Sequence, residues 1–345
     1  MRSPTLAVTV GDPAGIGPEI ALKAARRLAP RVEAGEMRLA LVTAPGPLAA
    51  IGAALDLPVP PVADARDPAG WPAVCALEAS PLRGEVRTGE VTPEGGRQAY
   101  EAVALATRLA MAGHAAALVT APLNKEAMHR AGIPHAGHTE MLAELTGVTG
   151  SAMMLAHGDF RVSHVTTHCA LEEVPRRATP ERMGRVIDLT LDVLRRLGIE
   201  RPRVAVAALN PHAGEGGAFG RHDIDVTAPL VGAYRARGED VRGPVPGDTV
   251  FVKLKARAYD AVVAMYHDQG HIPVKLLGFE VDPETGGWTG LSGVNVTLGL
   301  PILRTSVDHG TAFDIAGRGT ASERSLLEAV DYALALTGPP GGGTT

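Results

Sequence analysis

The sequence predicts an α/β protein built from two domains, and three observations support this. Apolar, β-branched runs of strand length alternate with longer segments of helical period that are rich in Ala, Leu and Arg. This alternation is typical of strand–helix units stacked around a mainly parallel sheet. The chain has 345 residues, which suffices for two domains at about 150 residues each. Its 45% apolar and 21% charged residues are the balance of a globular protein.

The expected elements follow from this alternation. Strands are expected at 5–10, 38–42, 116–119, 162–166, 204–208 and 261–265. Helices are expected at 18–28, 96–112, 180–197, 223–237 and 322–336. Pro18 and Pro180 fit first helical turns, because proline lacks the N–H group that has no intrahelical partner there. The polar stretch 124–138 and the region near Arg304 are the candidate seams between the domains, and the tail 338–345 (GPPGGGTT) is expected to be disordered.

Charge and hydropathy exclude several classes of function. The formal charge is −5 and there is no basic block, so nucleic acids and anionic membranes are poor partners. No stretch approaches the roughly 20 apolar residues of a membrane span, and no secretory signal precedes Gly11. Cys75 and Cys169 lack the C-x-x-C spacing of a zinc or redox site. A cytoplasmic protein is expected.

The first predicted strand runs into a glycine-rich turn, GDPAGIGPE at 11–19, before a helix begins. Glycines let backbone amides approach a ligand, and a helix N-terminus favours an anion, so a phosphate or carboxylate could dock here. The spacing is not G-x-G-x-x-G and supports no dinucleotide site by itself. A tight strand-to-helix turn is the alternative.

Three histidines follow predicted strands: His168, His212 and His267. The carboxyl ends of parallel strands lie on one edge of a sheet, where open α/β folds bind ligands. Three imidazoles on that edge could hold a divalent cation and leave positions open to substrate. The alternative for each histidine is an ordinary polar residue with satisfied hydrogen bonds.

Other polar residues surround these histidines in the sequence. Asp248 and Asp268 could orient the imidazoles or bind the cation, or they could cap a helix and form a turn. Lys125, Lys275 and Arg304 stand beside Gly, Pro or polar residues and suit a phosphate or carboxylate, although surface charge is the default. The glycine-rich stretch 308–319 is a functional loop or an elaborate turn.

These segments together resemble a known family. The motifs GDPAGIGPE, TAPLNK, GHTE, TTH, LNPHAGEGG, PGDT, YHDQG and GVNVTLGLPILRTSVDHGTAFDIAG are similar to those of the 4-hydroxythreonine-4-phosphate dehydrogenases of pyridoxal phosphate biosynthesis. The chain resembles the isocitrate and isopropylmalate dehydrogenases more distantly. The resemblance runs from Val8 to about Ala329.

The resemblance implies two α/β/α domains around a central cleft. It implies an outer domain of residues 1–137 and 302–337, with the adenosine-side loop, and a domain of residues 138–301 for metal, substrate and dimerisation. The activity implied is the NAD-dependent oxidation and decarboxylation of 4-phosphohydroxy-L-threonine to 3-amino-2-oxopropyl phosphate. NADP is an alternative cofactor, and zinc, magnesium or cobalt is the implied metal. The implied assembly is a homodimer with an active site shared across its interface.

The family pattern also implies roles for individual residues. Metal ligands are His168, His212 and His267. Substrate-binding residues are His138, Thr139, Lys275, Asn295 and Arg304. Candidates for the catalytic acid or base are Lys275, Asp248 and Asp268. The loop that binds the cofactor without a Rossmann fingerprint contains His309, Gly310, Thr311, Ala312, Asp314 and Ile315.

One departure from the family pattern and several alternatives remain open. The segment 281–291 is longer than in the family and contains Trp288, which could close over the site or form a solvent loop. A paralogous group acts on 4-phosphothreonate, and the motifs do not separate the two substrates. A metallohydrolase would use the same histidines to activate water. A metabolite-binding regulatory protein would leave the many titratable strand-end residues unexplained.

Overall fold

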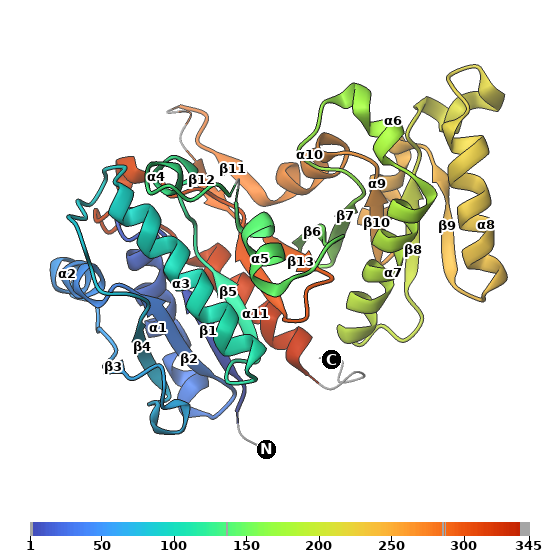
Figure 1. Cartoon of the computed structure of the whole chain (residues 1–345). Coiled ribbons are helices and arrows are strands. Elements are labelled where there is room, and N and C mark those ends of the chain that lie inside the picture. The colour runs from blue at the N-terminus through green and yellow to red at the C-terminus, as the bar shows by residue number, and fades with distance from the viewer. Residues whose placement is uncertain (1–2, 136, 285, 287, 339–345) are drawn as a thin grey trace. The chain divides into compact units, whose positions relative to one another are not determined.

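The computed structural model describes residues 3–135, 137–284, 286 and 288–338. The chain divides into two compact units, one formed by residues 1–149 and 300–337 and the other by residues 150–299. The expected disordered tail lies outside the described residues, apart from Gly338. Each unit is an α/β layer structure with helices on both faces of its strands (Figure 1).

The first unit contains six strands in the order β3-β4-β2-β1-β5-β14, and every pairing among them is parallel. Its strands are β1 (Thr5–Thr9), β2 (Arg38–Thr43), β3 (Val62–Ala63), β4 (Val74–Glu78), β5 (Ala117–Thr120) and β14 (Arg304–Val307). Its helices are α1 (Gly17–Glu33), α2 (Pro45–Leu55), α3 (Pro93–Met111), α4 (Lys125–Arg130), α5 (His138–Thr146) and α11 (Arg324–Thr337). The parallel sheet expected from the alternating runs is therefore present in this unit.

Helix α5 sets the boundary of the first unit. The resemblance implied that the second domain begins at residue 138, but the compact units divide after Thr149. Met141 and Leu142 of α5 are fully buried in the same apolar cluster as Val103 of α3 and Leu118 of β5. This burial keeps α5 with the first unit, because removing a buried Met or Leu from its cluster costs about 2–5 kcal/mol.

The main sheet of the second unit contains six of its described strands, in the order β13-β6-β7-β10-β8-β9. Its strands are β6 (Ala152–His157), β7 (Phe160–His164), β8 (Arg203–Ala207), β9 (Asp240–Val245), β10 (Ala261–Ala264) and β13 (Val294–Leu298), with a separate hairpin of β11 (Phe279–Val281) and β12 (Trp288–Leu291). Its helices are α6 (Val174–Arg177), α7 (Pro180–Arg196), α8 (Ala228–Ala236), α9 (Gly247–Lys255) and α10 (His267–Gly278), with a π-helical turn at Asp223–Thr227 before α8.

The sheet of the second unit is mixed. Strand β6 runs antiparallel to both β7 and β13, whereas β7, β10, β8 and β9 are parallel neighbours. Alternate residues of the strands face different helices, as the pleat requires. Val162 lies in the core with Val250 of α9 and Val274 of α10, whereas Ser163 accepts a hydrogen bond from Thr190 of α7. The sheet is therefore covered on both faces.

No described helix has the length and apolar composition needed to cross a bilayer.

Candidate functional site

The carboxyl ends of β7, β10 and β8 bring the predicted histidine segments to one edge of the second unit's sheet. Strand β7 ends at His164, two residues earlier than expected, so His168 lies four residues beyond it. His267 is the first residue of α10, three residues after β10. Because these three strands are parallel, the segments that follow them leave the sheet at the same edge.

Two of the predicted ligands lie close together. The ring centroids of His168 and His267 are 5.7 Å apart, and their planes are tilted by 40°. The Nδ1 atom of His267 is 2.6 Å from a carboxylate oxygen of Asp268. A carboxylate at this distance accepts the Nδ1 proton, which leaves Nε2 with a free lone pair for a cation. Asp268 therefore orients His267, one of the two roles expected for it.

His212 lies in a turn of unusual backbone conformation. Residues 212–216 all have positive φ, with values of 50° at His212 and 42° at Glu215. Non-glycine residues pay about 1 kcal/mol or more each for this left-handed conformation. The Nδ1 atom of His212 is 3.1 Å from the Glu215 carboxylate, and its ring packs edge-on against Phe219. Glu215 thus orients His212 as Asp268 orients His267, a role the sequence did not assign.

The donor chemistry of these residues fits a divalent cation, but their full convergence is not present. Within the ranges that the structure describes, no group of three or more His, Cys, Asp or Glu side chains is arranged to hold a metal ion. His168 and His267 form a pair, and the set of three stays a prediction. Asp248 is exposed in the first turn of α9, and its role at the cation stays a prediction.

Two further histidines lie behind this pair and were not predicted. The ring of His271 stacks on His267, and the ring centroid of buried His164 is 4.6 Å from that of His271. Burial lowers the pKa of His164 to about 3 and that of His271 to about 4. Both imidazoles are therefore neutral at pH 7. The signal for His271 was its i+4 spacing from His267 on one helix.

In the first unit, Arg304 is buried in the sheet next to predicted substrate residues. Its guanidinium donates to the Thr120 hydroxyl, and burial lowers the pKa of Arg304 to about 9. Burial is the main cause that lowers the pKa of His138 well below its usual value, and the positive charge of Arg304 adds to this shift. Thr139 follows in the first turn of α5. A buried cation with neutral hydrogen-bonding neighbours is suited to a phosphate or a carboxylate.

Several buried polar atoms at the predicted positions have no hydrogen-bond partner among the described residues. They are His138 Nε2, Asn295 Oδ1 and His309 Nε2. Buried polar atoms are normally paired, so such atoms are candidates for ligand contact. Lys275, on α10, lies with its Nζ 4.9 Å from the ring centroid of Phe279. Trp288 packs edge-on against the same ring, so Phe279 connects the longer segment to Lys275.

The predicted cofactor loop packs against the glycine-rich turn of the first unit. The backbone N–H of Ile16 donates to the carbonyl of Thr311, and a Cβ on Gly15 would lie 2.8 Å from that oxygen. Gly15 is therefore required by close packing, which favours the tight-turn interpretation of this segment. Asp12 in the same turn is fully buried, and burial raises its pKa to about 6.

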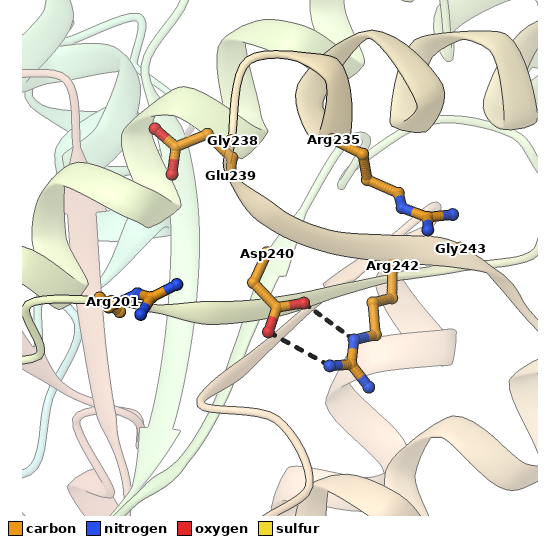
Figure 2. A pocket seen from close by; sticks show the side chains of 7 residues that line it. All are labelled: Arg201, Arg235, Gly238, Glu239, Asp240, Arg242 and Gly243. Atoms are coloured by element: carbon orange, nitrogen blue, oxygen red, sulfur yellow. Dashed lines mark hydrogen bonds and ion pairs between the residues drawn. The ribbon is translucent and has the colours of Figure 1, made fainter.

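A separate cavity of about 570 Å³ lies beside β9, and Figure 2 shows its lining. Its side chains are Arg201, Arg235, Glu239, Asp240 and Arg242, and Asp240 and Arg242 pair with each other. Arg201 precedes β8 and Asp240 begins β9, so these residues lie at the amino ends of parallel strands. The histidines follow the carboxyl ends. This cavity is therefore not part of the predicted site, and its charges are typical of a protected edge strand.

Comparison with known proteins gives the class and then the family. A protein of Bradyrhizobium diazoefficiens, provisionally named a D-threonate 4-phosphate dehydrogenase, is 62% identical over 97% of both chains. A 4-hydroxythreonine-4-phosphate dehydrogenase of Beijerinckia indica is 45% identical over 97% of this chain and 95% of its own. The crystal structure of 4-hydroxythreonine-4-phosphate dehydrogenase from Klebsiella pneumoniae matches with a TM-score of 0.81 and 43% identity, covering 97% of this chain and 98% of that one.

The α/β fold and these relatives define a dehydrogenase, as the motifs predicted. The family model described as pyridoxal phosphate biosynthetic protein PdxA matches residues 48–333. The chain belongs to the PdxA family.

Proposed function

We propose that this chain catalyses the NAD-dependent oxidation and decarboxylation of a 4-phosphorylated hydroxy acid. The substrate expected from the motifs is 4-phosphohydroxy-L-threonine, and the product is 3-amino-2-oxopropyl phosphate. The observation that carries the proposal is the likeness to named dehydrogenases over 97% of the chain. We expect the reaction to take place in the cytoplasm, where thiols such as those of Cys75 and Cys169 stay reduced.

A second substrate is favoured by a specific observation. The relative with 62% identity carries the name of an enzyme for D-threonate 4-phosphate, whereas the relative from Beijerinckia indica is only 45% identical. The two acids differ at C2, which carries an ammonium group in one and a hydroxyl group in the other. Both carry the reacting alcohol at C3, β to the carboxylate, so one catalytic arrangement serves either substrate.

We assign the cation to the second unit, with His168, His212 and His267 as ligands. The support is the His168–His267 pair and the carboxylates that orient His267 and His212. A divalent cation such as zinc, magnesium or cobalt, when bound there, acidifies the substrate hydroxyl and polarises the ketone. Neutral imidazoles leave the positive charge of such a cation intact. The neutral His271 behind His267 adds no opposing charge.

We assign the substrate's anionic groups to five residues. Arg304, with His138 and Thr139, is suited to one anionic group, because it is a buried charge with neutral donors beside it. Lys275 and Asn295 are proposed for the other. Fixing the reacting carbon against the nicotinamide in this way can contribute several kcal/mol. The loop His309, Gly310, Thr311, Ala312, Asp314 and Ile315 is proposed to bind the adenosine side of the cofactor.

The chemistry then follows in two steps. NAD⁺, when bound, would accept the hydride released as the C3–H bond breaks and would become NADH, while the C3 hydroxyl proton would pass to a base. The C1–C2 bond of the resulting β-keto acid breaks, carbon dioxide leaves, and the electron pair enters an enolate that is protonated at C2. Lys275, Asp248 and Asp268 are the candidates for these proton transfers. Asp268 lies next to His267, whereas Lys275 lies on the same helix two turns further on.

The assembly proposed from the family resemblance is a homodimer that shares its active site across the interface. Analytical ultracentrifugation of the active enzyme tests it, and a sedimenting species of monomer mass that retains full turnover would contradict it.

The cation assignment is tested with His212→Ala. We expect this variant to lose most of its bound metal and activity while it keeps a cooperative unfolding transition. Elemental analysis of the purified variant that shows unchanged metal content would remove His212 from the ligand set. Release of inorganic phosphate without formation of NADH would instead favour a metallohydrolase.

A further inference from the structure

In the second unit, hydrogen bonds from side chains to backbone groups hold the segments that carry the histidines. The hydroxyl of Thr166, two residues before His168, donates to the carbonyl of Met265 at 2.8 Å. The carboxylate of Asp223 accepts the backbone N–H groups of Leu209 and Asn210, just before His212. These bonds limit how far each segment can move.

Gln269 connects two of these segments directly. Its side-chain oxygen accepts the backbone N–H of Met265 at 2.7 Å, two residues before His267. Its side-chain nitrogen donates to the carbonyl of Ala208 at 2.8 Å, at the start of the segment that leads to His212. Met265 and Ala208 are both buried, so neither backbone group has water as a ready substitute.

The neighbours of Gln269 keep its side chain in place. A Cβ added at Gly247, the first residue of α9, would lie 3.2 Å from the Gln269 amide nitrogen. The next residue, Gly270, lies over the ring of buried His164, where a Cβ would come within 2.3 Å of Nε2. The amide is therefore packed between α9 and the other segments. Gln269 accepts one of its two hydrogen bonds and donates the other, and a primary amide side chain supplies both an acceptor and a donor.

We propose that Gln269 is a positioning residue that fixes the segment bearing His212 relative to the segment bearing His267, and so sets the cation site. This inference rests on the proposed function, in which both histidines bind the cation. Gln269 itself contributes no ligand and no proton. Its effect is exerted through the backbone at Met265 and Ala208.

Two variants separate the donor from the acceptor. Gln269→Met has a similar volume and removes both hydrogen bonds, whereas Gln269→Glu keeps an acceptor for Met265 but places a carboxylate oxygen against the Ala208 carbonyl. Tyr234→Phe is the matched control, because it also removes a part-buried hydrogen bond of this unit, to Asp188 at 2.7 Å. The probes are cobalt(II) binding, followed by its visible spectrum, and hydrogen exchange of the backbone in segments 208–217 and 265–268.

Both Gln269 variants are expected to weaken cobalt binding about 10–100-fold, the usual cost of losing an outer-shell partner of a metal site. They are also expected to quicken exchange in segment 208–217, although the substituted residue lies on the other segment. Tyr234→Phe should lower the unfolding temperature to a similar extent without either change. Cobalt binding equal to wild type in both Gln269 variants would overturn the inference and leave the proposed function intact.

Failure of the proposed function gives a different result. If wild-type protein binds no cobalt or zinc, the cation assignment is wrong, and hydrogen exchange then decides the role of Gln269. Faster exchange in 208–217 for the two Gln269 variants, but not for Tyr234→Phe, would still establish that Gln269 fixes the two segments. Unchanged exchange there would refute that.

Discussion

The imidazole rings of His267 and His271 stack with their centroids 3.6 Å apart and an angle of 12° between their planes. The Nδ1–H of His271 donates to the backbone carbonyl of His267 at 2.9 Å, one helical turn earlier. This bond holds the His271 ring against the face of His267, and Asp268 holds Nδ1 of His267. Together these contacts restrict the direction in which His267 Nε2 points.

The stack gives a first prediction. His271→Ala should weaken cobalt(II) binding about tenfold, because His267 loses the ring that orients it. His271→Phe should retain most of the affinity, since a phenyl ring keeps the stacking surface without the hydrogen bond. Isothermal titration of both variants makes the comparison. Equal affinity in the alanine variant and wild type would show that the stack has no such role.

A second prediction concerns Arg304. Arg304→Gln should raise the KM for the phosphorylated substrate about 100-fold or more, because a buried charge-assisted contact to an anion is lost. Since burial lowers the pKa of Arg304 to about 9, wild-type affinity should also fall as pH rises through about 9. Steady-state kinetics between pH 7 and pH 10 tests both statements. A KM that is flat with pH and unchanged in the variant would refute the assignment.

A third prediction concerns the buried Asp12. Its pKa is raised to about 6 by burial, so its contribution to stability is present below pH 3.8 and is lost as pH rises through 6. Asp12→Asn removes this dependence and keeps an oxygen for the Ala14 N–H. As the pH rises from 4.5 to 7.5, the free energy of unfolding of wild type should fall by about 2 kcal/mol relative to that of the variant. Urea unfolding at the two pH values measures this difference, and parallel pH profiles would contradict it.

A fourth prediction tests the packing behind the histidine pair. Gly270→Ala should destabilise the protein by about 2 kcal/mol, since the new methyl group overlaps the His164 ring. Gly232→Ala is the control, because Gly232 lies exposed in α8 with open space around it and should gain about 1 kcal/mol in helix propensity. Thermal unfolding ranks the two variants. Equal stability of the two variants would mean that the His164 ring can shift to admit the new methyl group without loss of stability.

The sequence predicted the parts of the fold that local pattern determines. The strands that became β1, β2, β5, β7, β8 and β10 and the helices that became α1, α3, α7, α8 and α11 were expected within a few residues. The antiparallel strand β6 was not expected, because its run of Ala, Met and Leu does not alternate in polarity. Strand pairing is set by contacts between distant residues, such as Leu155 with Asn295, and local pattern does not contain them.

The site was predictable at the level of residue types rather than contacts. His168, His212 and His267 were expected to converge on one cation; the rings of His168 and His267 lie 5.7 Å apart, whereas the set of three stays a prediction. Asp268 was expected to orient an imidazole or to bind the cation; its carboxylate contacts Nδ1 of His267, and its role at a cation stays a prediction. The bonds of Gln269 were out of reach, because they join backbone groups 61 and 4 residues away and no residue-type rule specifies them.

The most direct test is a parallel turnover assay with 4-phosphohydroxy-L-threonine and D-threonate 4-phosphate. Purified protein is supplied with NAD⁺ and a divalent cation, and NADH is followed by its absorbance while carbon dioxide is trapped. We expect NADH and carbon dioxide in equal amounts from at least one substrate, with kcat/KM identifying the preferred C2 group. Absence of NADH with both acids, in protein that carries its metal, would contradict the proposed function.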